Sequence, residues 1–315
     1  MMIFLKSLEL AAPLLLLTAL GYFLGKQGMF SGDTSVNLSK LVLNVLLPIS
    51  IFNYIYESDF KSAFNIKLLS FVLISNAILV VILIIISHFF TSDKRKLGAM
   101  IQAGVRGNYS IFALPLAISI SGDLIAGPMT IIIAFLTPLY NVFAMALFEH
   151  YQDSKSNMLK RIANVLRTPI MLATILGITL NLGGIVIPTF IYETLKYIGK
   201  SVTAISLINL GSSFNFKINK SIIKFVAISL VYKLVIVPLI MLPCGVLFGF
   251  RDLALVIILV IATAPIATSA FSTAVCYDTD VELTSTTVVY SYLFCSITIP
   301  LFLSIITYMG LIWDI

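Results

Sequence analysis

The residues most able to do chemistry in this sequence form a polar run inside an apolar segment. Residues 97–121 read LGAMIQAGVRGNYSIFALPLAISIS, and the centre of this stretch contains Arg106, Asn108, Tyr109 and Ser110. An arginine at bilayer depth costs about 2.5 to 3.5 kcal/mol, so the protein must compensate for it. Pro115 follows; it removes a helical N–H and clashes with the carbonyl four residues earlier. We therefore expect a broken helix here and take residues 104–115 as the functional centre.

A second interrupted stretch lies about half a chain further on. Residues 262–274 read ATAPIATSAFSTA and place Pro265, Thr268 and Ser269 among small and hydroxyl-bearing neighbours. Irregular backbone at membrane depth persists where it is buried in protein or lines a watery cavity, and discontinuous helices build the substrate sites of many secondary transporters. We expect the two breaks to cross near the middle of the membrane.

A crossing of this kind favours an anionic ligand. The half-helices that begin after the breaks direct partly positive N-terminal ends and unpaired N–H groups into the same space. Arg106 would add a full charge and a bidentate fork that suits a carboxylate. The predicted substrate-binding residues are Arg106, Asn108, Tyr109, Ser110, Pro115, Pro265, Thr268, Ser269 and Asn44.

Structural alternatives stay open for several of these residues. Arg106 lies ten residues after Lys96, so its side chain could snorkel to the water and anchor the helix. Pro115 and Pro265 could kink two packed helices without forming a site.

Three further polar residues lie in apolar segments. Asn44, in LVLNVLLPISIF, and Asn209, in LINLGSSF, could line the cavity or hydrogen-bond to a neighbouring helix. For Lys233, in the eighth apolar segment, we favour a snorkelling or packing role over contact with substrate.

The elements that must position these residues are membrane-spanning helices. Hydrophobic residues make up 59% of the chain and charged residues 11%, and the mean hydropathy of +1.07 lies far outside the range of soluble globular domains. The apolar runs are continuous rather than alternating, which favours helices over the strands of a barrel. Ten spans are predicted, at residues 5–25, 35–55, 66–90, 97–121, 127–149, 160–182, 200–215, 219–249, 252–275 and 284–312.

The two halves of the chain resemble one another. Pro13 and Gly21 in the first span match Pro169 and Gly177 in the sixth, each pair at a separation of 156 positions. We predict a duplication, with residues 1–155 as the first five-helix repeat and residues 156–315 as the second. Because five is odd, the second repeat must enter the membrane from the opposite side, so the repeats are inverted.

The distribution of basic residues predicts the orientation of the chain. Loops after odd-numbered spans, including the connector at residues 150–161, carry 12 Lys and Arg residues, whereas the other side, with both termini, carries six. The positive-inside rule then places the connector in the cytoplasm and both termini outside, for a multi-pass protein of the cell membrane. This topology accounts for the net charge of +6, and no soluble domain offers a basic face to nucleic acid.

Signatures of enzymes and of metal sites are missing from the sequence. His88 and His150 occur without an HExxH motif, and neither a nucleophile elbow nor a P-loop is present. The three cysteines show no CxxC spacing. We expect no enzymatic activity, no cofactor and no metal centre.

With these features the sequence resembles the auxin efflux carrier family, which includes plant PIN-type carriers and bacterial permeases assigned to malate or malonate. The resemblance rests on LVLNVLLPISIF, RGNYSIFALPLAISISGD and APIATSAFSTAVCYDTD in the second, fourth and ninth spans, and it covers essentially the whole chain. The connector of about a dozen residues lacks the long hydrophilic loop of many plant carriers, which fits a bacterial permease better.

The resemblance implies a fold shared with bile acid/sodium symporters. Spans one, two, six and seven would form a scaffold, and spans three to five with eight to ten a transport unit that moves like an elevator. It also implies small organic anions as substrates, often a homodimer, and crossover roles for Asn108, Pro115 and Pro265.

Three functional hypotheses follow. The first is a secondary transporter that holds a small carboxylate such as malate or malonate at the crossover. The second is a sodium-coupled symporter of the bile acid type, with Thr263, Thr268 and Ser269 around the ion. The third is a membrane-embedded sensor or partner protein that transports nothing. The sequence leaves open the substrate, the direction of transport and the coupling ion, whether Na⁺ or H⁺.

Overall fold

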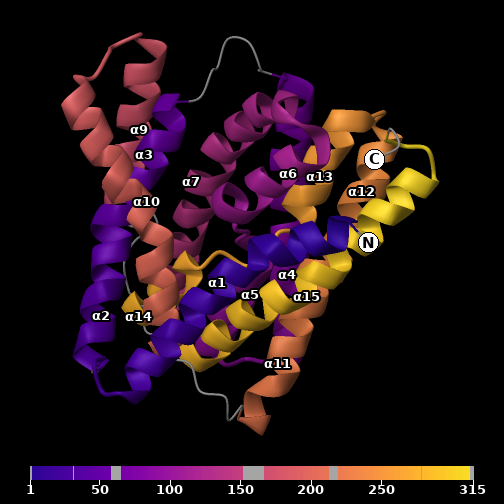
Figure 1. The fold of residues 1–315 in the computed structure, drawn as a ribbon. Coiled ribbons are helices and arrows are strands. Elements are labelled where there is room, and N and C mark those ends of the chain that lie inside the picture. Colours follow the sequence, from indigo (N-terminus) through magenta and orange to yellow (C-terminus); the bar gives the residue numbers. More distant parts are fainter. Residues whose placement is uncertain are drawn as a thin grey trace.

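The computed structural model describes residues 2–30, 32–57, 65–151, 167–212, 219–277 and 279–312. Within these ranges the regular structure is helical, and the strand-type pairing is one isolated bridge between residues 107 and 266. Figure 1 shows α2, α3, α9 and α10 together along one side of the molecule, beside a larger group of helices. The expected all-helical fold is confirmed.

The first half of the chain begins with three long helical stretches. α1 covers Met2–Lys26. The second stretch runs from α2 (Gly32–Leu41) through a π-helical turn, η1 (Val42–Leu46), into α3 (Leu47–Glu57). α4 covers Ile66–Phe90, and the Asn65 side chain caps its start by accepting from the Leu68 N–H at 3.0 Å.

The remaining helices of the first half enclose the first break. α5 (Lys94–Val105) begins at Asp93, whose carboxylate accepts from the Arg95 and Lys96 amides. After the break come a π-helical turn, η2 (Tyr109–Ala113), and α6 (Leu114–Ser121). A short 3₁₀ turn, η3 (Asp123–Ile125), leads into α7 (Ala126–Tyr151).

The second half of the chain is also helical where the structure describes it. α9 (Pro169–Leu182) starts with proline at its first position, where no N–H is needed. α10 covers Thr189–Ser212. α11 (Lys220–Val231), the π-helical turn η4 (Tyr232–Ile236) and α12 (Val237–Leu247) form one continuous stretch. α13 (Asp252–Thr263) and α14 (Ser269–Cys276) flank the second break, and α15 (Val281–Tyr308) ends the described chain.

Helix covers most of each predicted span in the described residues, apart from residues 106–108 in the fourth span and 264–268 in the ninth. The starts of two helices also differ from the prediction. The seventh helix begins at Thr189 rather than at residue 200, because its polar first turns are stabilised by Lys196, which pairs with Glu57 at 3.3 Å and Glu193 at 3.7 Å. The sixth begins at Pro169, and most of the predicted connector at residues 150–161 lies outside the described residues.

Among the described residues, length and composition single out four helical stretches that can cross a membrane: Asp33–Glu57, Ile66–Phe90, Lys220–Leu247 and Val281–Tyr308. Shorter apolar helices, including Pro169–Leu182 and Asp252–Thr263, accompany them. The chain is therefore an integral membrane protein. Ten crossings and an inverted relation between the halves stay predictions.

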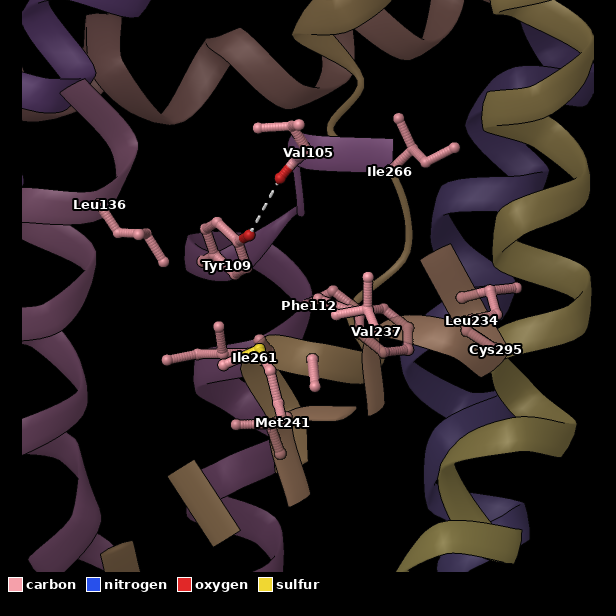
Figure 2. Close-up of a cluster of buried hydrophobic side chains, with 14 of the residues drawn as sticks. Val105, Tyr109, Phe112, Leu136, Leu234, Val237, Met241, Ile261, Ile266 and Cys295 are labelled. Carbon is pink, nitrogen blue, oxygen red and sulfur yellow. Dashed lines mark hydrogen bonds between the residues drawn. The ribbon is translucent and has the colours of Figure 1, made fainter. Parts of the chain in front are cut away.

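The buried apolar side chains form two separate clusters. The larger core draws on α4 to α7 and α11 to α15, with two leucines of α10, and Figure 2 shows part of it around Tyr109, Phe112 and Met241. The smaller core consists of Val42, Leu43, Leu46, Leu47, Ile51, Ile55, Ala134, Ile170 and Val202. The second, sixth and seventh spans thus pack mainly against one another.

α1 joins this group through contact of two helix backbones. A Cβ atom on Gly21 would lie 2.1 Å from the Ile208 carbonyl oxygen, and one on Gly211 would lie 1.9 Å from that of Thr18. Only glycine permits so close an approach of α1 to α10. These two helices are held together along their length.

Candidate functional site

The two predicted breaks are present, and they cross. α5 ends at Val105 and α13 ends at Thr263, and in both places the chain becomes extended before it re-enters helix. The Asn108 N–H donates to the Pro265 carbonyl at 2.7 Å, and the Ala267 N–H donates to the Arg106 carbonyl at 3.1 Å. The expectation that the fourth and ninth spans are interrupted and meet is confirmed; that they meet midway through the membrane stays a prediction.

Local sequence explains the shape of the first break. The Asn108 carbonyl accepts from the Phe112 and Ala113 amides at 3.3 and 3.1 Å, which produces the wide turn η2. Pro115 is the second residue of α6, which continues directly from η2, so the break lies before Tyr109 and not at the proline. Pro115 does not line the cavity described next.

A cavity of about 60 Å³ lies at the crossing. This volume holds a few water molecules, whereas pockets for drug-sized ligands measure about 300 to 1,000 Å³. Its walls come from both breaks, from α3, and from single residues of α7 and α10. The lining residues are Leu47, Ser50, Ile51, Tyr54, Gly107, Asn108, Tyr109, Ser110, Thr137, Val202, Ala267, Thr268 and Ser269.

Five predicted residues meet at this cavity: Asn108, Tyr109, Ser110, Thr268 and Ser269. The Asn108 amide nitrogen donates to the Tyr292 hydroxyl at 2.6 Å, and the Asn108 side chain is buried. The Tyr109 hydroxyl reaches the Val105 carbonyl at 3.4 Å, as the dashed line in Figure 2 indicates. Tyr109 and Ser269 begin the helical segments after the breaks, so the N-terminal ends of both segments border the same small space.

Arg106 lies behind the cavity rather than on its wall. Its guanidinium donates to the Thr273 hydroxyl at 2.7 Å and to the Ser269 hydroxyl at 2.8 Å, both on α14. With 3% of its surface exposed, Arg106 does not snorkel to the membrane surface. The fork therefore ties the end of α5 to α14, and it reaches the cavity through Ser269, which lines the wall.

The two asparagines outside the breaks take different positions. Asn44, in the turn η1, is exposed and does not line the cavity, so the structure does not bring this predicted residue to the site. Asn209 is buried and donates to the Ser35 carbonyl at 3.1 Å and to the Ser39 hydroxyl at 2.9 Å. The interhelical alternative thus holds for Asn209.

The charge of the interior is one-sided. Among the residues whose side chains the structure describes, the buried charged ones are Arg106 and Lys233, and every Asp and Glu there is exposed or half-buried. No group of His, Cys, Asp and Glu in the described chain could hold a metal ion. A site with buried cations and without carboxylates favours a negative ligand.

Sequence reasoning missed part of the site. Leu47, Ser50, Ile51 and Tyr54 line the cavity from α3 at spacings of three and four residues, the pattern of one helical face. That pattern after Pro48 could have indicated them. Thr273 and Tyr292, which hold Arg106 and Asn108, carry no comparable signal because hydroxyl residues are frequent in both helices.

Comparison with known proteins finds a matching family and several similar transporters. The model of a family described as membrane transport protein matches residues 7–303. An uncharacterized transporter of Methanothermobacter thermautotrophicus is 25% identical over 304 residues, covering 95% of this chain and 98% of that protein. An uncharacterized transporter of Methanocaldococcus jannaschii is 21% identical and covers 93% and 97%. The uncharacterized transporter YfdV of Escherichia coli is 24% identical over 251 residues, covering 74% and 76%.

Proposed function

Because the chain belongs to the membrane transport protein family, which comprises the auxin efflux carriers, we propose that it is a secondary transporter of small organic anions such as malate or malonate. The membrane transport role follows from the family. The substrate class is our proposal, and it rests on the site.

The observation that carries the proposal is the cavity at the crossing of the two breaks. Two helical starts border it, hydroxyl and amide groups line it, and Arg106 stands behind Ser269. A carboxylate entering this space would meet the partly positive helix ends and hydrogen-bond donors, and the nearby guanidinium would lower its energy further. The small volume supports a compact anion over a large one.

We further propose that the anion moves with the larger core. The cavity lies where helices of the larger core meet α3, which belongs to the smaller core, and α10, which contributes to both cores. An elevator-like displacement of α4 to α7 and α11 to α15 along the group formed by α1, α2, α3, α9 and α10 would carry the site from one side of the membrane to the other. Separate apolar cores support such a movement, because each group keeps its own packing while it slides.

For the topology we propose ten crossings in two inverted repeats, residues 1–155 and 156–315, with the connector in the cytoplasm and both termini outside. The repeated order of helices in the two halves, each with one broken helix, supports the repeat. A reporter fused after Ile315 that is active only in the cytoplasm should be silent. Activity there would reverse the orientation. Assembly as a homodimer stays a prediction.

We propose that transport does not need sodium. The sodium alternative placed the ion among Thr263, Thr268 and Ser269, but Ser269 accepts a hydrogen bond from Arg106, and the Thr263 hydroxyl donates to the Leu259 carbonyl at 2.7 Å. A cation fixed to the chain thus already lies beside one of the three hydroxyls, that of Ser269. Replacing sodium by potassium on both sides of the membrane should leave the rate of transport unchanged.

The decisive experiment is uptake of radiolabelled malonate and malate into proteoliposomes that contain the purified protein. We expect saturable uptake that unlabelled dicarboxylates compete away and that protein-free liposomes lack. If no small organic anion in a broad panel is taken up or exchanged, the transport proposal fails, and the alternative of a sensor or partner protein gains support.

A further inference from the structure

Lys233 is a buried cation that the site described so far does not use. It lies in the π-helical turn η4 between α11 and α12, with 1% of its surface exposed. Such turns interrupt a helix in a way that often accompanies function. The sequence favoured a snorkelling or packing role for this residue, and its burial excludes snorkelling.

One interaction of the Lys233 ammonium is shown in the described part of the chain. Its Nζ atom lies 5.8 Å from the centroid of the Tyr109 ring, a cation–π contact, and no hydrogen bond or ion pair of this group is found among the described residues. The helices packed against η4 include α13 and α15, whose acidic residues Asp252 and Glu282 are exposed at the helix starts. A cation–π contact with the Tyr109 ring offsets only part of the hydration free energy that the ammonium loses on burial.

Tyr109 separates this ammonium from the cavity. The tyrosine lines the cavity, whereas Lys233 does not. The ring rests on Gly107, where a Cβ atom would come within 2.4 Å of it, and it stacks on Tyr140 at 6.0 Å between centroids. Its hydroxyl bond to Val105, at 3.4 Å, is long. The Tyr109 hydroxyl also interacts with the Tyr140 hydroxyl and the Gly107 backbone. A change of its rotamer therefore has to exchange these contacts together with the packing of the ring.

We propose that Lys233 is the counter-charge that meets the transported anion directly and that Tyr109 is the movable screen between them. This inference rests on the proposed function. When the ring turns aside, the ammonium behind it faces the cavity, and a carboxylate there replaces the ring as its partner. Arg106 cannot take this part without releasing two short hydrogen bonds. The two cations thus have different roles: Arg106 is held in place and shapes the site, whereas Lys233 contacts the ligand.

The first test measures how malonate protects the purified protein against thermal unfolding, with neutral malonamide as the control ligand. Lys233→Met should raise the half-saturating malonate concentration by at least about tenfold, because the bound carboxylate loses its buried partner. Lys233→Arg keeps the positive charge, so it should raise the half-saturating malonate concentration less than Lys233→Met does. Lys224→Met is the matched control: Lys224 also lies over a ring, that of Phe90 at 5.4 Å, but it is exposed on α11, so its removal should change nothing. Unfolding without malonate reports whether each variant is folded. A malonate response of Lys233→Met equal to the wild type overturns the proposal.

The second test needs no substrate. Lys233→Cys is prepared in a background in which Cys244, Cys276 and Cys295 are replaced by serine, and it is exposed to a negatively charged methanethiosulfonate reagent. We expect slow labelling with Tyr109 present and at least about tenfold faster labelling after Tyr109→Ala. Equal labelling rates with and without the Tyr109 ring would overturn the proposal that this ring screens residue 233. If malonate does not protect the wild type but labelling depends on Tyr109, the substrate proposal fails while the screen is supported.

Discussion

The two breaks have the same backbone role but opposite chemistry. Each interrupts a helix, and each gives one N–H and receives one in the pair of bonds that join them. The first break supplies donors and charge, from Arg106 and Asn108. The second supplies acceptors: the Pro265 carbonyl and, just after it, the hydroxyls of Ser269 and Thr273.

This contrast shows how two similar half-chains can build one asymmetric site. A pair of identical breaks would place two guanidinium groups together, or none. Here the cation comes from one half and the groups that orient it come from the other. We infer that the first break is the chemically demanding one and that the second tolerates more change.

The largest expected effect is that of Arg106→Met. It removes the fixed charge and two hydrogen bonds of a charged donor, each worth about 1.5 to 3 kcal/mol, so uptake of malonate into proteoliposomes should fall by at least about 100-fold. Arg106→Lys keeps the charge but lacks the two-pronged guanidinium, so its malonate uptake should lie between that of Arg106→Met and that of the wild type. Near wild-type uptake by Arg106→Met would show that transport does not need the charge of Arg106, and it would contradict the contrast between the two breaks.

The next effect contrasts small residues in the two breaks. Gly107→Ala places a Cβ atom against the Tyr109 ring and should reduce uptake by roughly 10- to 100-fold, in line with the 1 to 3 kcal/mol typical of overpacking. Ala267→Gly, in the second break, should cost about 0.5 to 1 kcal/mol of stability and change uptake less than about threefold. Thermal unfolding measured beside uptake separates misfolding from a blocked site. An equal loss of uptake in the two variants would contradict the inference that the first break tolerates less change than the second.

A smaller effect is expected for Asn108→Ala. The change leaves the buried Tyr292 hydroxyl without this donor, at a cost of about 1 to 3 kcal/mol, and uptake should fall about tenfold. Asn44→Ala is a matched control, because Asn44 is the same residue type in another span but is exposed, so we expect stability within about 0.5 kcal/mol of the wild type and unchanged uptake. The comparison is reversed if Asn44→Ala is the more damaging variant.

The smallest effect should come from Pro265→Ala. The structure uses the carbonyl of Pro265, which alanine retains, and the extended backbone there accepts either residue. Unfolding free energy should change by less than about 1 kcal/mol and uptake by less than about threefold. A loss as large as that of Gly107→Ala would mean that the ring of Pro265, rather than its carbonyl, is what the second break requires.

The sequence alone located the helices and both interruptions. Continuous apolar runs predicted the helices, as for α4 at residues 66–90, and clusters of small and polar residues, at 106–108 and 264–268, predicted where a helix is interrupted. The half-chain repeat made the second break predictable from the first. These features are local, so they need no knowledge of neighbouring helices.

Only the tertiary structure decided which way the polar side chains point. Asn44 faces outward, Lys233 faces inward, and Arg106 turns from the cavity toward Ser269 and Thr273. A helix that is apolar on every side gives no periodic signal for its packed face, because lipid tails and protein interior attract the same residues. The partners of a polar group in such a helix are therefore fixed by packing between distant segments, which the order of residues along the chain does not reveal.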